Sequence, residues 1–298
     1  MKFSVVLTAF LLYFGCMNYA RSAVYIAAHP DDIELFMNVN ASNDVYRHAN
    51  TVFILTTAGD GGYGPNVGIN VQGTPYYRAR LWGHERAVRF WQSLDGLALP
   101  ASVHTTEVVL GHAIEKITFG NVVMYNLKLP DGDFGGAGFA VNGYQSLARL
   151  LNGSISSISS IDGTNNYTLT DLENTINQLI VKNNQGTGPV WVNIQDEDLT
   201  INSNDHSDHT STAKVVLAGL ASNPAYSCIS VARFQDYVIS GEAVNETADQ
   251  QNIHIGTWGA LNSGLVDYGN TNSWDVAHIG WMGRQYFRFN YTGQNCSF

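Results

Sequence analysis

The stretch that decides the fold is Val24–Asp32, which reads Val-Tyr-Ile-Ala-Ala-His-Pro-Asp-Asp. It begins as an apolar run of strand-forming residues and ends in a histidine, a proline and two carboxylates. Because Pro30 has no backbone N–H, it cannot continue a sheet ladder. We therefore predict a buried strand whose carboxyl end carries reactive side chains, which is where open α/β sheets bind their ligands.

The side chains at the end of this strand suit a metal site. His29 and Asp32 can turn toward one point, and an imidazole nitrogen and a carboxylate oxygen are common zinc ligands. Asp31 would then be free to handle a proton on the attacking water. The structural alternative is that the two aspartates cap a helix that begins near Ile33, as Asp often does. This segment alone does not decide between the two.

A second cluster, Asp205-His206-Ser207-Asp208-His209, precedes Thr210–Ala221, which has the apolar spacing of a helix. Histidines three apart near a helix start lie on neighbouring parts of its surface, so both can face one small volume. Separately, His206 could be an exposed loop residue and Asp208 a helix cap. Both clusters together favour a shared metal site, because packing does not explain so many ionisable groups in so few positions.

These motifs resemble those of the PIG-L/LmbE-like deacetylases, zinc enzymes that remove acetyl groups from N-acetylglucosamine derivatives. The likeness covers about Val24 to Ala221 and extends to Leu55–Asp60, to Arg80 and to Leu129–Gly132. It is closest to the secreted branch of that family. The part of the chain beyond about Ser222 matches only loosely.

The resemblance implies that one zinc ion is held by His29, Asp32 and His209. Three protein ligands leave a coordination position for water, which is typical of catalytic zinc. The same ligand set also suits iron or other divalent ions. Asp31 is then the general base that takes a proton from the attacking water.

The resemblance also implies that His206 stabilises the oxyanion and protonates the leaving amine. A carboxylate, either Asp208 or Asp205, would orient His206 and raise its pKa. Some relatives carry a tyrosine two positions before this histidine to help at the oxyanion. Here that position is Asn204, so the role is vacant or filled by another residue.

Two further residues are expected to bind substrate by resemblance. Arg80 would contact the sugar, although most helix arginines are solvated or salt-bridged. Asp131 would accept a hydrogen bond from a sugar hydroxyl, although Asp in a glycine-rich turn is usually structural. The six histidines outside the two clusters have no partner cluster in the sequence and are expected to be structural or exposed.

Composition limits the class of protein. A chain of 298 residues with 45% hydrophobic residues can bury a substantial core. The net charge of -10 argues against nucleic acid, which requires clustered Lys and Arg. We predict a single α/β domain: a Rossmann-like three-layer sandwich with a mostly parallel central sheet, plus an added β-hairpin and C-terminal strands.

The hydrophobic pattern places the other elements. Strands are predicted in four regions: Val52–Thr56, three pieces within Val103–Leu127, Val190–Val192, and the C-terminal stretches Ser230–Ile239 and Gly283–Phe289. Helices are predicted at Tyr76–Leu94, at Gly143–Asn152, and from a capping box formed by Thr170 and Glu173 through Lys182. Between Ile239 and Gly283 only aromatic residues stand out.

The chain begins with a predicted secretory signal, Met1–Ala20, which has a positive start and an apolar core too short to span a bilayer comfortably. Residues 21–298 would form the one domain, with a core at about 24–221 and a divergent part at 222–298. An exported protein could join Cys228 to Cys296 in a disulfide, or both thiols could stay free.

The predicted function is therefore that of a secreted zinc-dependent hydrolase acting on an N-acetylated sugar or glycoconjugate. Two alternatives stay open: an amidase for a non-sugar acyl amide, and a secreted carbohydrate-binding protein without catalysis on the same fold. The sequence does not indicate an oligomeric state.

Overall fold

The structure is a computed structural model, and it describes residues 22–67, 74–184, 190–223 and 229–292. The predicted signal peptide, Met1–Ala20, lies outside these residues, as do Cys228 and Cys296 of the predicted disulfide. Within the described part of the chain, no helix combines the length and the apolar character needed to cross a membrane.

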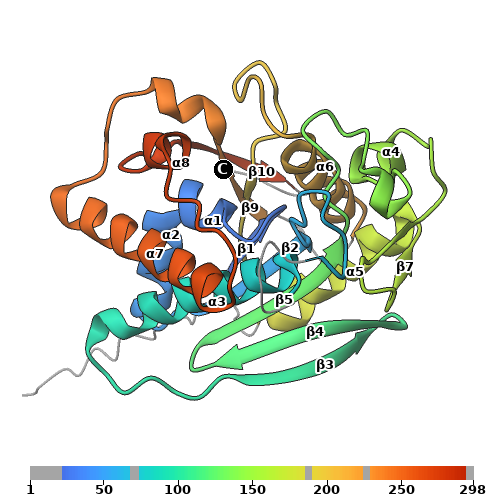
Figure 1. Cartoon of the computed structure of the whole chain (residues 1–298). Helices are drawn as coiled ribbons and strands as arrows, with labels where there is room; N and C mark the ends of the chain where they lie inside the picture. Colours follow the sequence, from blue (N-terminus) through green and yellow to red (C-terminus); the bar gives the residue numbers. More distant parts are fainter. Residues whose placement is uncertain (1–21, 68–73, 185–189, 224–228, 293–298) are drawn as a thin grey trace, which may run out of the picture.

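An eight-stranded sheet forms the middle layer, in the order β10-β9-β8-β1-β2-β5-β4-β3 (Figure 1). The five strands from β9 to β5 are parallel, whereas β10 and the β3–β4 hairpin are antiparallel to their neighbours. The mostly parallel sheet with an added hairpin and C-terminal strands is thereby confirmed. The strands are β1 (Ser22–Ala27), β2 (Asn50–Thr57), β3 (Val103–Val109), β4 (His112–Phe119), β5 (Val122–Leu129), β8 (Trp191–Gln195), β9 (Ile229–Phe234) and β10 (Phe287–Thr292), beside a small separate pair, β6 (Ile158–Ser159) and β7 (Asn166–Tyr167).

Helices cover both faces of the sheet and make the outer layers. Side chains alternate along β1, so Tyr25 packs into the core on one face while Val24 and Ile26 pack into the core on the other. The first face carries α1 (Asp32–Phe36), α2 (Asn38–Tyr46), α3 (Tyr76–Gln92) and α7 (Ala248–Asp267), and the second carries α4 (Leu147–Leu151), α5 (Leu169–Asn183) and α6 (Ser207–Ser222). This is the predicted three-layer sandwich.

The topology brings the two sequence clusters together. From β1 the chain adds β2 and β5 on one side, and later adds β8 and β9 on the other. β1 and β8 are therefore parallel neighbours, with Val24 opposite Val192. Their carboxyl ends meet at the same edge, at the point where the strand order reverses, and this is where open α/β sheets form a crevice.

Several predicted boundaries were wrong. The capping box of α5 is formed by Thr168 and Asp171, two residues before the predicted box, and the helix begins at Leu169. The predicted helix Gly143–Asn152 is reduced to α4, which begins after the cap Ser146. The predicted strand Ser230–Ile239 ends at Phe234, because the chain then turns into the 3-10 helix η3 (Tyr237–Gly241).

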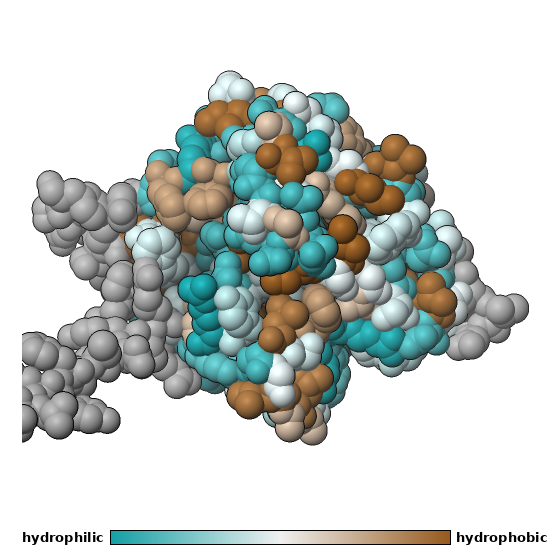
Figure 2. All heavy atoms as spheres, turned by 90° about the vertical axis from the view of Figure 1, so that its left-hand side faces the viewer, coloured by the Kyte–Doolittle hydropathy of each residue, from teal (hydrophilic) through white to brown (hydrophobic). Residues whose placement is uncertain are grey.

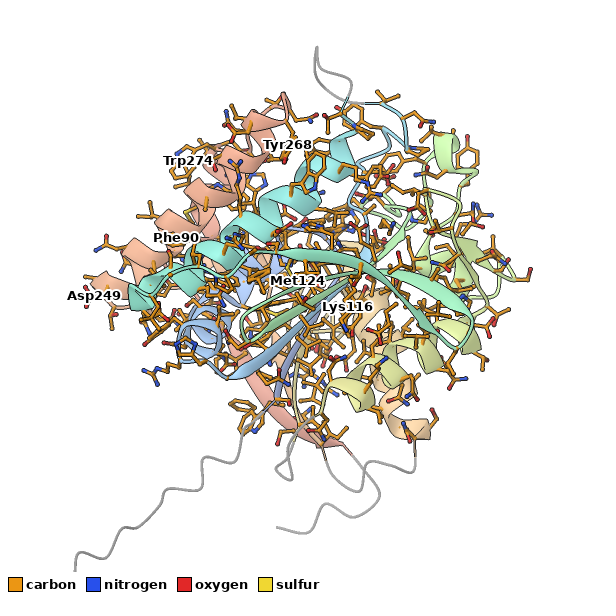
Figure 3. All side chains as sticks on the ribbon, turned by 90° about the horizontal axis from the view of Figure 1, so that it is seen from below. Phe90, Lys116, Met124, Asp249, Tyr268 and Trp274 are labelled. Atoms are coloured by element: carbon orange, nitrogen blue, oxygen red, sulfur yellow. The ribbon has the colours of Figure 1, made fainter. Side chains whose placement is uncertain are left out.

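The sequence did not reveal α7, although it is 20 residues long. Its buried positions include His254, Asn262 and Gly264, so its apolar residues do not form a clear stripe. It runs antiparallel to α3, as the view from below shows (Figure 3). A Cβ on Gly264 would lie 2.6 Å from the Cα of Gly83, so the two backbones touch where both residues are glycine.

The side of the molecule on which α7 lies is shown in Figure 2. Hydrophilic and hydrophobic residues are interspersed over this face, and the hydrophobic ones form only small groups. Scattered exposed apolar residues of this kind are ordinary for a protein surface. The functional site is therefore sought at the carboxyl edge of the sheet.

Candidate metal centre and active site

The structure brings His29, Asp32 and His209 together. His29 follows β1, Asp32 is the first residue of α1, and His209 lies in the first turn of α6. His29 Nδ1 is 3.1 Å from His209 Nε2, and the Asp32 carboxylate lies 3.5 Å from the first nitrogen and 3.1 Å from the second. Three side chains that are all able to bind a metal thus form a compact triangle, in which Asp32 Oδ2 faces His29 and Asp32 Oδ1 faces His209.

The size of this triangle fits a metal ion. Ligand atoms about 2.0–2.2 Å from one tetrahedral zinc are separated from each other by roughly 3.4 Å. The two ring nitrogens lie 3.1 Å apart and Asp32 Oδ1 lies 3.1 Å from His209 Nε2, which is close to that spacing. His206 also offers a ring nitrogen within 4.8 Å of a nitrogen of both histidines.

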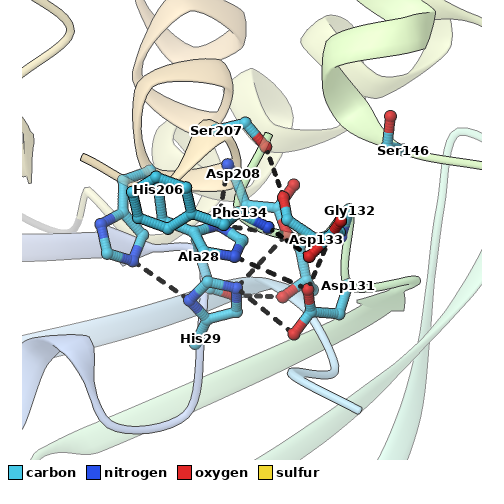
Figure 4. Close-up of polar contacts among 12 residues, drawn as sticks. Ala28, His29, Asp131, Gly132, Asp133, Phe134, Ser146, His206, Ser207 and Asp208 are labelled. Carbon is cyan, nitrogen blue, oxygen red and sulfur yellow. Dashed lines mark hydrogen bonds and ion pairs between the residues drawn. The ribbon is translucent and has the colours of Figure 1, made fainter. Parts of the chain in front are cut away.

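Each of these two histidines also has a carboxylate at its outer nitrogen. His209 Nδ1 is 2.8 Å from Asp205. His29 Nε2 is 3.3 Å from Asp208, as Figure 4 shows. Carboxylates accept, so in neutral rings the outer nitrogens carry the protons and the inner nitrogens present lone pairs. In that neutral form the two lone pairs lie 3.1 Å apart, and one cation between them would bind both. Carboxylates in this position typically orient metal-binding histidines.

A buried network holds the carboxylate behind His209. Asn202 donates hydrogen bonds to Asp205 at 2.9 Å and to Asp236 at 3.0 Å, and its own oxygen accepts from the backbone N–H of Asp236. Asn202 and Asp236 have no exposed surface. Burial, followed by the negative charge of Asp205, raises the pKa of Asp236 well above its usual range. Neither Asn202 nor Asp236 was singled out from the sequence.

The electrostatics of the triangle are dominated by its carboxylates. Burial by itself lowers the pKa of His29, but the charge of Asp32 and its other acidic neighbours outweigh this and raise the pKa to about 10. For His209 burial is likewise outweighed, first by Asp205 and then by Asp32, and its pKa is raised well above the usual range. The site therefore favours positive charge among these side chains.

Asp31 does not cap α1 with its side chain, so the structural alternative for this residue is not realised. Its carboxylate pairs with the guanidinium of Arg80, which also donates to the backbone oxygen of Gly59 at 2.7 Å. Gly59 has a φ of +56°, and a Cβ there would collide with the Arg80 guanidinium. Arg80 thus reaches the site, as predicted, but its partner in the structure is Asp31.

His206 is the N-cap of α6. Its Nδ1 accepts a hydrogen bond from the backbone N–H of Asp208 at 3.2 Å, so Nε2 carries the proton in the neutral ring. Nε2 lies 3.8 Å from Asp131. Burial, followed by the charge of His29, lowers the pKa of His206 to about 4.

The predicted partners of His206 have other positions. Asp205 contacts His209, and Asp208 lies 3.9 Å from His206 but 3.3 Å from His29. Asp208 also accepts from the backbone N–H of Gly132 at 2.8 Å, and a Cβ on Gly132 would lie 2.5 Å from this carboxylate. The sequence could not assign these partners, because spacing along α6 does not fix which ring each carboxylate faces.

Asp131 forms the structural turn and also lies beside the two histidines of the site. One oxygen accepts from the backbone N–H of Asp133 at 3.0 Å, which is the structural turn. The carboxylate also lies 3.8 Å from His29 and 3.8 Å from His206, so it faces the site. Its backbone N–H donates to the fully buried Asp60 at 2.9 Å, which ties the loop after β2 to the loop after β5.

A cavity of about 200 Å³ lies over these residues. His29, Asp31, Asp32, Arg80, Asp131 and His206 line one part of it, and Leu35, Tyr76, Tyr237, Ser273, His278 and Trp281 complete it. The C-terminal part of the chain, which matches the family only loosely, therefore supplies four residues of the wall. Sequence reasoning missed this contribution, because the four residues are separated in the chain and form no motif.

Two positions discussed from the sequence are now clear. Asn204 is exposed in a turn with a φ of +56° and does not line the cavity. His278 was expected to be structural or exposed without a partner; it lines the cavity and lies 2.8 Å from Asp275. The structure thus leaves Asn204 outside the cavity and places His278 in its wall.

Comparison with known proteins gives the following. No protein-family model matches the sequence, and no curated protein matches it. The chain is similar to several deacetylases of known structure. N,N'-diacetylchitobiose deacetylase from Pyrococcus horikoshii shares 15% identity over 93% of this chain and 87% of that chain, with a TM-score of 0.48. The zinc-inhibited form of teicoplanin deacetylase Orf2 shares 13% identity over 82% of this chain and 85% of its own, with a TM-score of 0.43.

A hydratase is also among the similar structures. GalB, the 4-carboxy-2-hydroxymuconate hydratase from Pseudomonas putida, shares 8% identity over 88% of this chain and 82% of its own, with a TM-score of 0.41. Similarity at this level does not fix a reaction, because one fold hosts many activities. What the site does must be argued from its own residues.

Proposed function

We propose that this protein is a zinc-dependent hydrolase that removes the acetyl group from an N-acetylglucosamine-type substrate. The observation that carries the proposal is the triangle formed by His29, Asp32 and His209, with two ring nitrogens 3.1 Å apart. Asp31 and His206 line the same cavity. A base and a hydrogen-bond donor beside a three-ligand metal site suit hydrolysis of an amide.

His29, Asp32 and His209 would hold the zinc, and Asp205 and Asp208 would orient the two histidines. When bound, zinc polarises an amide carbonyl and lowers the pKa of water to about 7. Zinc is favoured by the mixed imidazole and carboxylate ligands, which iron also accepts. Metal analysis of the purified protein decides between them.

Asp31 acts as the general base. Its ion pair with Arg80 fixes the direction of the carboxylate. It takes a proton from the water whose oxygen bonds to the amide carbon. It then delivers this proton to the nitrogen as the C–N bond breaks, so acetate and a free amine leave the site.

His206 stabilises the oxyanion. Its Nε2–H donates a hydrogen bond to the carbonyl oxygen as negative charge develops there. Because Nδ1 already accepts from the backbone N–H of Asp208, the neutral ring has no second proton to spare. We therefore assign proton delivery to Asp31, although the family resemblance gives the acid role to His206.

Tyr237 is a second donor for the substrate. Its ring is parallel to Trp281, with centroids 4.8 Å apart, and to Phe134, with centroids 6.4 Å apart, so its faces have aromatic neighbours. Tyr237 therefore lines the cavity with the edge of its ring. Among the described residues its hydroxyl has no hydrogen-bond partner. Burial raises the pKa of Tyr237, so the hydroxyl keeps its proton. It fills the role that is vacant at Asn204.

The test is an assay of purified, zinc-loaded protein against N-acetylglucosamine, its short oligosaccharides and acyclic acetamides, with mass spectrometry for loss of an acetyl group. We expect acetate and free amine from the sugars, and no product after chelation. Turnover of acyclic amides alone would replace the proposal by an amidase. Sugar binding without turnover by metal-loaded protein would leave a carbohydrate-binding protein.

Export is also proposed, on the basis of Met1–Ala20 alone. Expression of the full chain in a secreting host should release a protein that begins near Arg21. Amino-terminal sequencing checks this, and retention of Met1 in secreted material would contradict it.

A further inference from the structure

The C-terminal part of the cavity wall includes a short helix, α8 (Val276–Trp281), whose His278 lines the cavity. The metal side of the cavity is deeply buried, since the side chains of His29 and Asp32, which line it, are 6% and 4% exposed. The His278 side chain is 24% exposed. His278 therefore lies nearer the mouth, where the part of a substrate away from the reacting amide would lie.

The ring of His278 is fixed on several sides. Both carboxylate oxygens of Asp275 lie 2.8 Å from Nδ1. The ring stacks on the buried Trp258, with centroids 5.1 Å apart and an interplanar angle of 22°, and meets Trp281 edge-on at 5.3 Å. An imidazole held this firmly loses little freedom when it binds a ligand.

The segment that carries His278 is anchored as well. The backbone N–H of Ser273 donates to the buried side-chain oxygen of Asn262 on α7 at 2.6 Å, and Asp275 caps α8 through the backbone N–H groups of Ala277 and His278. The wall is thus attached to α7, which itself packs closely on α3. Its position is set by the core and not by a free loop.

One nitrogen of His278 remains for a ligand. A carboxylate only accepts, so Nδ1 donates to Asp275 and Nε2 of the neutral ring is an acceptor. Among the described residues Nε2 has no hydrogen-bond partner. An acceptor of this kind is matched by a hydroxyl group, and sugar rings carry several.

We propose that His278 is a specificity-determining residue, whose Nε2 accepts a hydrogen bond from a ring hydroxyl of the N-acetylated sugar. The inference rests on the proposed function and names the part of the substrate that the C-terminal wall selects. Asp275 is a positioning residue, because it acts by holding the ring. The metal triangle recognises the acetamide group, and His278 distinguishes a sugar from any other acetamide.

The test compares the wild type with His278→Leu and His278→Gln, and uses His104→Leu as a matched control. His104 is also a partly exposed histidine beside a carboxylate, 3.4 Å from Glu85, but it does not line the cavity. Each variant is assayed with N-acetylglucosamine, its monodeoxy analogues and an acyclic acetamide. Metal content and thermal unfolding are measured for all of them.

We expect His278→Leu to raise KM for N-acetylglucosamine roughly tenfold, as loss of one hydrogen bond does, with kcat within about twofold. The effect should disappear on the one deoxy analogue that lacks the recognised hydroxyl and on the acyclic acetamide. His278→Gln, which retains an acceptor, should restore part of the affinity. An equal loss on every substrate, or loss of metal, would overturn the proposal and leave a structural role.

A binding measurement separates this proposal from the proposed function. In an Asp31→Asn background, calorimetry with N-acetylglucosamine reports affinity without turnover. A roughly tenfold weaker affinity on adding His278→Leu supports His278 even if no acetate is ever released. Unchanged affinity, with turnover intact in the parent protein, rejects His278 and leaves the hydrolase standing.

Discussion

The two sides of the cavity are built in different ways. On one side, His29, Asp32 and His209 come from two short clusters that follow neighbouring parallel strands, and each histidine is held by a buried carboxylate. On the other side, Tyr237 and His278 come from η3 and α8, which lie far apart in the chain and are separated by α7. The first side rests on the sheet edge, and the second rests on helix packing and aromatic stacking.

This difference indicates which residues can be substituted to change the substrate specificity without loss of metal binding or catalysis. Ligands and base must keep fixed positions around one point, so they lie on the loops that the sheet holds most firmly. A wall on separate helices can vary residue by residue, since each residue touches a different part of the substrate. Changes on the metal side should therefore affect metal content or kcat, and changes on the C-terminal side should affect substrate selection.

The largest effect on kcat is expected from a substitution of the general base, Asp31. Asp31→Asn removes the proton acceptor and should lower kcat by roughly 10²–10⁴-fold, the usual contribution of general base catalysis. Metal content should stay stoichiometric, because Asp31 is not a proposed ligand. Acetate release and elemental analysis of the same sample measure both. Full activity would remove Asp31 from the mechanism.

The ligand set is tested by His209→Ala, which should lose the metal altogether. Asp205→Asn is milder and should weaken metal affinity roughly 10–100-fold, as loss of a carboxylate behind a histidine ligand does. Competition with a chelator measures the affinity, and Asp249→Asn on the exposed start of α7 is the control. Stoichiometric zinc in His209→Ala would reject the triangle as the metal site.

Tyr237 lies between the two sides of the cavity, so Tyr237→Phe tests both. Its ring centroid is 5.2 Å from that of His209, and its ring stacks on Trp281. Removing the hydroxyl should lower kcat roughly tenfold, the effect of one hydrogen bond to developing charge, while the stacked ring keeps the wall in place. Steady-state kinetics decide, and Tyr144→Phe at an exposed position is the control. A change in KM alone would show that Tyr237 binds the ground state only.

The smallest effect concerns the helix that supports the wall. Gly264→Ala forces a Cβ against the backbone of Gly83 and should destabilise the protein by about 1–3 kcal/mol. Gly259→Ala on the same helix meets no atom within 4 Å and should stabilise it by about 0.4–1 kcal/mol. Denaturant unfolding compares the two. Equal responses would mean that the close approach of α3 and α7 has no energetic role.

Part of the fold and of the candidate site could be predicted from the sequence. The strand pattern of Val24–Ala28 and the order of strands predicted the parallel sheet, because buried strands read as continuous apolar runs. The histidine and aspartate clusters predicted a shared site, since parallel strands end at one edge. Helix α7 was not visible, because it buries polar residues such as His254 and Asn262 beside Trp258, Leu261 and Leu265 and exposes Ile255 and Val266, so its apolar pattern is blurred.

The sequence by itself determined the sheet, the two clusters at its edge and the kinds of ligand they offer, because periodicity and residue chemistry are local properties. Only the tertiary structure decided the partners: Asp205 at His209, Asp208 at His29, Arg80 at Asp31, and the residues that close the cavity. The physical reason is that a partner is chosen by the packing of elements that are distant in the chain. No spacing along the chain records that choice.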